Sequence, residues 1–204
     1  MPRPRSLTTA DLGNAALAVI DRDGLEGLTM RAVAKELGIA TMGLYRYVAD
    51  RDQLEVLVVD RVLGAMETAP PEGEDWRAMA VVLLARMRSA VAAHLAVVPL
   101  ILRHRQSSAA SLHWMEAMLT VLTDAGFTGR DRVIAQRTVV GFLLGFLQNE
   151  HYASITGPGT ATIAALSTDD FPLLVQTASQ ARKMSVDDEF RGGVEIVLRG
   201  LSPR

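Results

Sequence analysis

Apolar residues recur at three- and four-residue spacing along almost the whole chain, a pattern that predicts helices rather than strands. The first stripe lies in a helix that we expect to run from Thr8 or Thr9 to about Arg22. Its apolar members are Leu12, Ala15, Ala16, Val19 and Ile20. Either threonine can cap this helix, and Asp11 lies in the first turn, where the helix dipole favours a carboxylate.

Two short helical patterns follow between Leu28 and Tyr47, separated by a tight break at Gly38. Their apolar positions are Val33, Ala34 and Leu37 in the first helix and Ile39, Leu44 and Tyr47 in the second. Gly38 permits the positive φ that a sharp turn between helices requires. The pattern predicts a helix-turn-helix, a motif whose second helix enters the major groove of DNA.

The rest of the chain is predicted to be helical as well. Asp50 and Gln53 resemble a capping box, so a helix should start there and end near Ala69, before two prolines. The later helical patterns cover residues 74–94, 96–104 with an interruption at Pro99, 108–125, 131–154, 160–182 as two short helices around Pro172, and 187–201.

These elements predict an all-α protein of two domains. A three-helix DNA-binding domain should occupy residues 1–55, and a larger helical domain should occupy residues 56–204. An arm formed by residues 1–7 carries Arg3 and Arg5. It is either a frayed terminus or a segment that reaches phosphates or the minor groove.

Composition narrows the chemistry. The chain of 204 residues has no cysteine, which excludes disulfides and thiolate metal sites, and its four histidines have no recognisable metal-binding spacing. We therefore predict no metal and no cofactor. The absence of a Gly-rich phosphate loop and of a paired acid–base constellation argues against an enzyme. The N-terminus lacks an apolar signal core, and no apolar run approaches the roughly 20 residues that span a bilayer, so we expect a cytoplasmic protein.

Four short segments carry a family resemblance: Leu28–Ala34, Leu37–Ile39, Leu44–Val48 and Asp50–Leu54. With them, the region from Thr8 to about Arg61 closely resembles the DNA-binding domain of TetR-type transcriptional repressors. The end of the chain, with Phe190, Gly193, Leu198 and Gly200-Leu201, is similar to the final dimerisation helix of the tetracycline-repressor branch. The resemblance implies a homodimer that binds a palindromic operator in double-stranded DNA and is released by a small, lipophilic effector.

Two positions depart from the family pattern. Ala40 stands where many members have a serine or threonine that caps the recognition helix, which leaves Thr41 as the candidate cap. Gly43 stands where many members have a side chain that contacts DNA, so this position offers only close backbone approach.

The resemblance also assigns the expected DNA contacts. Arg31 would bind a guanine edge, Thr41 a base or phosphate, and Met42 a thymine methyl group. The predicted DNA-binding residues are Arg31, Thr41, Met42, Gly43, Tyr45, Arg46, Tyr47 and Arg51. Three alternatives stay open: Arg31 as an ordinary exposed arginine, Arg46 in contact with solvent alone, and Tyr47 as a core residue.

Charge gives a test of this interface. Residues 1–61 hold eight Lys/Arg against nine Asp/Glu, and the whole chain has a net charge of −2. Most of the acids lie away from the proposed contact edge, where Arg31, Arg46 and Arg51 gather with the arm. A basic patch confined to this edge predicts a salt-dependent affinity of modest slope.

Apolar and aromatic residues of the larger domain are candidates for an effector pocket. The predicted ligand-binding residues are Trp76, Met79, His94, Trp114, Met118, Phe142, Phe146 and His151, with Met87, Arg103, His113 and Gln148 as further candidates. For each of them alone, ordinary core or surface is the favoured interpretation, whereas the Met and Trp content of the whole set suits a pocket for apolar ligands. A helix-turn-helix regulator that responds to a protein partner instead of a small molecule stays open, as does, less favoured, an all-helical enzyme or binding protein.

Small residues in the long helix suggest a helix–helix contact. Gly141 and Gly145 are four residues apart on one face and would allow close backbone approach. The predicted dimerisation residues are Gly141, Gly145, Phe190, Val194 and Val197. Close packing within one subunit is the alternative.

Overall fold

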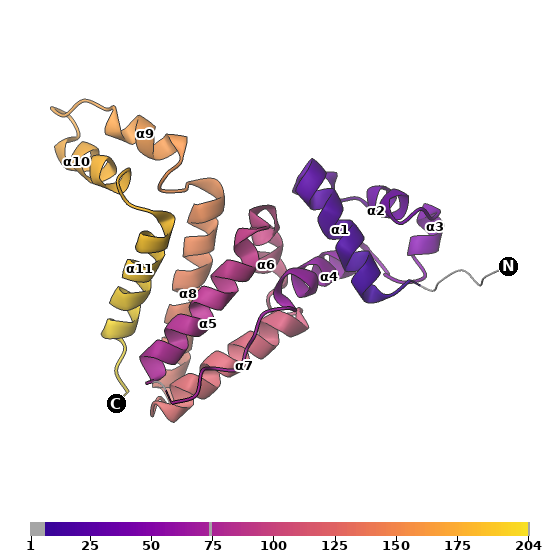
Figure 1. The fold of residues 1–204 in the computed structure, drawn as a ribbon, viewed down its shortest axis with the longest axis horizontal. Helices are drawn as coiled ribbons and strands as arrows, with labels where there is room; N and C mark the ends of the chain where they lie inside the picture. Colours follow the sequence, from indigo (N-terminus) through magenta and orange to yellow (C-terminus); the bar gives the residue numbers. More distant parts are fainter. Residues whose placement is uncertain (1–6, 74, 204) are drawn as a thin grey trace. The chain divides into compact units, whose positions relative to one another are not determined.

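The computed structural model describes residues 7–73 and 75–203, and this described chain is helical with no strand, as predicted. Figure 1 shows the helices. Their bounds are α1 Thr9–Asp23, α2 Met30–Glu36, α3 Thr41–Leu44, α4 Arg51–Leu63, α5 Trp76–Ala92, α6 Val98–His104, α7 Ala109–Asp124, α8 Gly129–Tyr152, α9 Pro158–Ala164, α10 Pro172–Ala181 and α11 Val186–Gly200. Two 3-10 turns, η1 Leu25–Gly27 and η2 Leu95–Val97, complete the described elements.

Contacts divide the chain into two compact units. The first unit runs up to Ala69 and resumes from Ala85 to Ala117, so it joins the helix-turn-helix to α4, α6 and the first part of α7. The second unit contains Pro70–Leu84 and continues from Met118, so it holds α8 to α11.

The first unit is built on α1 packed along α4. Leu12 and Ala16 of α1 and Leu54 and Val58 of α4 are fully buried. Gly13 lets the two helices approach closely, because a Cβ there would lie 3.0 Å from the backbone oxygen of Leu57. This pair of helices forms the base on which α2 and α3 are held.

Local capping explains where three helices of the first unit, α1, α2 and α4, begin. Thr8 and Asp11 form a reciprocal capping box at α1. Thr29 accepts from the backbone N–H of Ala32, and Asp50 accepts from that of Gln53. These starts agree with the sequence prediction. The end of α4 does not, because the helix stops at Leu63 rather than near Ala69.

Three prolines, Pro99, Pro158 and Pro172, lie in the first turn of a helix. Pro99 was expected to interrupt a helix, but it is the second residue of α6, where a missing N–H removes no helical hydrogen bond. Pro158 and Pro172 likewise open α9 and α10, in agreement with the two short helices expected there.

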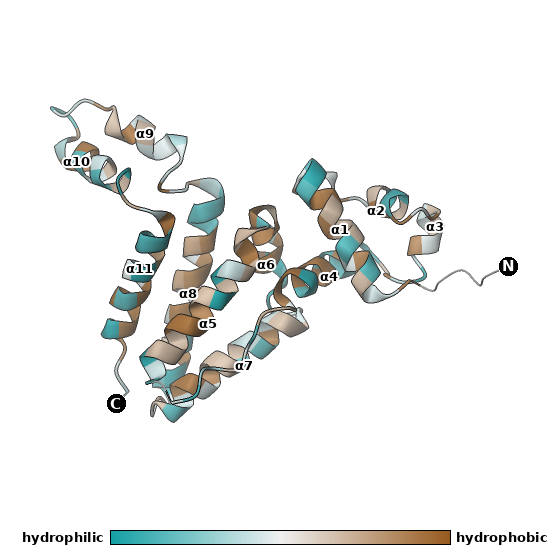
Figure 2. Ribbon diagram, in the orientation of Figure 1, coloured by the Kyte–Doolittle hydropathy of each residue, from teal (hydrophilic) through white to brown (hydrophobic). Residues whose placement is uncertain are grey.

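The second unit has an apolar core between α8 and α11, which lie side by side in Figure 1. The ring of Phe190 lies 4.9 Å from that of Phe146 and 6.1 Å from that of Phe142. Gly193 makes this packing possible, since a Cβ at that position would lie 2.6 Å from the Phe142 ring. Hydrophilic and hydrophobic residues alternate around α11 in Figure 2, as expected for a helix with one buried face.

No single helix in the described chain is long and apolar enough to cross a membrane; α5 and the following segment to His104 reach the required apolarity only together, across a bend of 102°.

Candidate nucleic-acid interface and effector site

The turn between α2 and α3 has the geometry that the sequence predicted. Gly38 has a φ of 67°, in the left-handed region that favours glycine. The backbone N–H of Ile39 donates to the carbonyl of Ala34 at 3.0 Å, which closes the turn. The chain then enters α3 at Thr41.

The recognition helix α3 has no side-chain cap. Ala40 occupies the N-cap position, and Thr41 is the first residue inside the helix. The expectation that Thr41 caps this helix is therefore wrong, because a cap must precede the first helical residue and accept from N–H groups further along. Only four residues, ending at Leu44, have regular α-helical geometry. Turns follow as far as Tyr47.

Burial separates the predicted contact residues into two groups. Arg31, Arg46 and Arg51 are exposed, as are Met42 at 76% and Tyr45 at 46%. Thr41, Gly43 and Tyr47 are half-buried. The structure thus leaves a tyrosine at 45 on the surface and uses Leu44 and Val48, both buried, to fix the segment on the core.

Arg51 has a structural partner that the sequence analysis did not identify. Its Nε donates to Oε1 of Glu55, one helical turn later, at 2.8 Å. The Glu55 side chain is fully buried. Its other oxygen, Oε2, accepts from His104 Nε2 at 2.7 Å and from Arg103 Nη1 at 2.9 Å. The i,i+4 spacing of Arg51 and Glu55 was a visible signal, whereas both α6 partners lie far away in sequence.

The Glu55 carboxylate is held in its charged form. Burial raises the pKa of Glu55. Hydrogen bonds from His104 and Arg51 and the charge of Arg103 together lower the pKa by more than burial raises it, so it lies below its ordinary value. Asp52, Glu55 and His104 also offer ligand atoms within 4.8 Å of one another. Because two guanidinium groups already neutralise Glu55, we interpret the cluster as an ion-pair network and not as a cation site.

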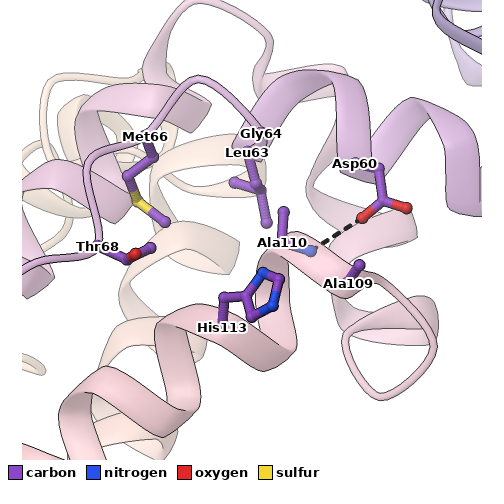
Figure 3. Close-up of a pocket in the computed structure, with 8 residues that line it drawn as sticks. All are labelled: Asp60, Leu63, Gly64, Met66, Thr68, Ala109, Ala110 and His113. Carbon is purple, nitrogen blue, oxygen red and sulfur yellow. Dashed lines mark hydrogen bonds between the residues drawn. The ribbon is translucent and has the colours of Figure 1, made fainter.

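A second polar connection lies nearer the end of α4. Oδ1 of Asp60 accepts from Ser108 Oγ at 2.6 Å and from the backbone N–H of Ala110 at 3.1 Å, so an α4 carboxylate caps the start of α7. Figure 3 shows the cavity beside this contact. Its lining residues are Asp60, Leu63, Gly64, Met66, Thr68, Ala109, Ala110 and His113.

None of the eight predicted ligand-binding residues is among the residues that line this cavity. Of the wider set of candidates, only His113 lies among its lining residues. In the first unit, His94 Nδ1 pairs with Asp21 Oδ1 at 3.0 Å, and Trp114 is buried. In the second unit, Trp76 packs edge-on against Phe127 with centroids 5.4 Å apart, and Met118 is fully buried.

The remaining predicted ligand residues have neighbours in the second unit. Phe142 and Phe146 pack on each other with centroids 6.2 Å apart. The His151 ring contacts Tyr152 of the same helix at 4.2 Å, and Met79 is half-buried. Most of the predicted pocket residues thus have packing or polar partners inside their own unit.

The five predicted dimerisation residues differ in accessibility. Phe190 and Val194 are buried inside the subunit, so in this structure they form core and present no surface; Val197 is half-buried. At Gly141 and Gly145, no described neighbour lies within 4 Å of where a Cβ would stand. The close intrasubunit approach is made instead by Gly193, opposite Phe142.

An exposed α3 set on a buried base, with α2 behind it, defines a helix-turn-helix protein. The family described as bacterial regulatory proteins of the tetR family matches residues 12–54, and the tetracyclin repressor-like C-terminal domain matches residues 69–204. The chain belongs to the TetR family of transcriptional regulators.

Relatives that match almost the whole chain support this family assignment. The chain is 30% identical to the HTH-type transcriptional repressor DrrR1 of Streptomyces coeruleorubidus, covering 98% of this chain and 78% of that protein. It is also 30% identical to the class D tetracycline repressor protein of Escherichia coli, over 92% and 85% of the two chains. The fold matches the Streptomyces coelicolor TetR family protein ActR in complex with (S)-DNPA, with a TM-score of 0.82, 25% identity and coverage of 97% and 98%.

Proposed function

We propose that this protein is a transcriptional repressor that binds a palindromic operator as a homodimer and is released by a small lipophilic effector. The observation that carries the proposal is the helix-turn-helix itself. Met42 on α3 and Tyr45 directly after it are exposed, while Leu44 between them is buried. Residues 1–55 would form the DNA-binding domain, and residues 56–204 the domain for effector binding and dimerisation.

In this proposal the residues of the interface contact different parts of the DNA. Arg31 reads a guanine edge, and Met42 contacts a thymine methyl group. Thr41 and Gly43 lie beside them, where Gly43 allows the backbone to approach the bases. Tyr45, Arg46 and Tyr47 contact phosphates along the groove edge, and Arg51 contacts a phosphate at the start of α4.

The glycine face of α8 supports the dimer. Gly141 and Gly145 share one helix face, and no described side chain of the subunit covers either position. A second subunit could therefore approach the α8 backbone there, which is what a two-fold operator needs. On α11, Val197 is half-buried and Ile196 is 69% exposed. We propose Val197 and Ile196 as neighbours of the glycine face at the interface, with Phe190 and Val194 supporting them from the core.

Two features support control by a small molecule. ActR, to which the chain is structurally similar, was solved with the ligand (S)-DNPA. The chain also has a cavity of mixed lining at the end of α4, bordered by Leu63, Met66 and His113. We propose that lipophilic compounds bind the helical domain and alter how α4 holds the helix-turn-helix.

Selection of bound sequences from random double-stranded DNA tests the operator. The expected result is a palindrome whose half-sites lie about one helical turn or somewhat more apart. Affinity for the selected site should fall as salt rises, because phosphate contacts release counterions. Recovery of no enriched sequence would refute the proposal of operator binding.

A thermal-shift screen with lipophilic compounds tests the effector. A compound that raises the melting temperature should also release the selected operator. If no lipophilic compound shifts the melting temperature, control by a protein partner becomes the favoured interpretation. The operator result would stand in either case.

A further inference from the structure

A carboxylate, that of Glu55, is buried among the apolar side chains of α4. Its side chain has no exposed area, yet three cationic or donor side chains surround it. A carboxylate is costly to bury unless each oxygen has partners. Both oxygens of Glu55 do have partners: Oε1 accepts from Arg51, and Oε2 accepts from His104 and Arg103.

The Arg51 atom that bonds Glu55 determines which N–H donors of the guanidinium are left to bind DNA. Only its Nε bonds to Glu55, and no described residue accepts from its two terminal amino groups. The Arg51 side chain is 46% exposed. A guanidinium held at Nε keeps a free edge with two parallel N–H donors, which is the geometry that binds a phosphate bidentately.

The partners on α6 fix the position of the acceptor. His104 is itself buried and bonds Oε2 at 2.7 Å, and Arg103 bonds the same oxygen at 2.9 Å. The carboxylate therefore cannot follow Arg51 if that side chain swings away. Because Arg51 has a fixed acceptor, less of the rotamer freedom of a long side chain is left to lose when it binds DNA.

We propose that Glu55 is a positioning residue for operator binding: it orients Arg51 so that the two terminal amino groups of this arginine meet a DNA phosphate. The inference rests on the proposed function, and specifically on Arg51 as a phosphate contact. It assigns to Glu55, which touches no DNA, a share of the affinity that is expressed only through Arg51.

A double-mutant cycle on the full-length protein and its selected operator tests this inference. Arg51→Ala should weaken binding roughly tenfold and lower the slope of log affinity against log salt by about 0.9 for each phosphate that the protein no longer neutralises. Glu55→Gln should weaken binding about three- to tenfold in the wild-type background. In the Arg51→Ala background the same Glu55→Gln change should have no effect, because the residue on which Glu55 acts is gone.

The matched control is Glu36→Gln, which removes an acid from another ion pair of the same unit, the pair with Arg22 at 2.9 Å. Operator affinity should be unchanged by this control. An equal loss from Glu55→Gln in both backgrounds would overturn the inference, because a merely structural role lowers affinity whether or not Arg51 is present. Wild-type affinity in Arg51→Ala would overturn it too, with operator binding intact. Failure of the wild-type protein to bind any operator would refute the proposed function instead.

A second variant keeps the test decisive if Glu55→Gln does not fold. Arg51→Lys preserves the charge at an exposed position, but a single ammonium cannot both bond the buried carboxylate and bind a phosphate bidentately. Operator affinity should fall toward that of Arg51→Ala. Wild-type affinity in Arg51→Lys would show that orientation by Glu55 contributes nothing.

Discussion

The two units use different physical means to hold a pair of helices together. In the first unit, α4 is tied to α6 and to the start of α7 by the carboxylates of Glu55 and Asp60. In the second unit, α8 and α11 are held by the packed rings of Phe142, Phe146 and Phe190. Apolar packing is non-directional and insensitive to pH, whereas charged hydrogen bonds depend on direction and protonation. The two carboxylates of α4, whose hydrogen bonds depend on direction and protonation, therefore lie in the unit that contains the helix-turn-helix.

The largest effect should come from breaking the apolar contact. Phe190→Ala removes a ring that is 4% exposed and is expected to lower the free energy of unfolding by about 3–5 kcal/mol, because it leaves a cavity among the remaining rings. Urea unfolding followed by circular dichroism measures the loss. The control is Phe171→Ala in the same unit, where the ring is 49% exposed, with an expected change within about 0.5 kcal/mol. Equal losses in both variants would show that the three-ring cluster does not hold α11.

The next effect should come from the buried carboxylate. Glu55→Ala leaves the His104 ring buried without its acceptor and should cost about 1–3 kcal/mol. Glu36→Ala, which breaks an ion pair with the exposed Arg22, should cost about 1 kcal/mol or less. Urea unfolding at neutral pH gives both values. A loss of stability at position 36 as large as the loss at position 55 would mean that the buried Glu55 pair stabilises the fold no more than an exposed ion pair does.

The same residue gives the first unit a pH dependence of known sign. The folded pKa of Glu55 is lowered, so the unfolded chain binds this proton more readily than the folded chain does. The stabilisation is present above the ordinary carboxyl pKa and is lost as pH falls through the folded pKa. Wild-type stability should therefore fall in this acid range, and Glu55→Gln should flatten the decrease. An unchanged acid slope in Glu55→Gln would contradict the assignment.

The sequence could predict these elements where the cause is local. Thr8, Thr29 and Asp50 each cap a helix through the N–H group three residues further on, and the starts of all three helices were predicted. Gly38 was predicted because a tight turn has few solutions in φ and ψ. The α6 partners of Glu55 and the partners of Asp60 at the start of α7 could not be predicted in this way, since they lie 48 to 50 residues away and depend on how α4 packs.

The predicted dimerisation residues show a second kind of information that the sequence does not contain. The stripe that contains Phe190 and Val194 was recognised as apolar, but a stripe looks the same whether it covers its own core or a second subunit. The structure puts both residues in the core. Gly193, beside them, faces the ring of Phe142, but a glycine in the sequence does not show whether its close neighbour belongs to the same subunit.

A smaller effect should come from the cap that α4 provides for α7. Asp60→Asn keeps the size of the side chain but replaces the charged oxygen that accepts from Ser108 and Ala110 by a neutral amide. It should lower the free energy of unfolding by about 1–2 kcal/mol. Thermal unfolding measures the loss. Glu26→Gln is the control, an exposed acid of the same unit, and its melting temperature should match the wild type. A wild-type melting temperature in Asp60→Asn would indicate that α7 does not need this cap.

The smallest expected effect is a gain, and it concerns the recognition helix. Ala40 has the extended backbone of an N-cap residue, with φ −68° and ψ 144°, but no side-chain oxygen to accept from the first N–H groups of α3. Ala40→Ser supplies that oxygen and should stabilise the protein by about 0.5–1 kcal/mol. Ala40→Val, which cannot cap, should give no gain. Thermal unfolding compares the two variants, and hydrogen exchange at Leu44 reports whether the gain lies in α3. A stabilisation by valine as large as that by serine would show that the effect comes from packing, and the missing cap would then not explain why α3 has only four regular residues.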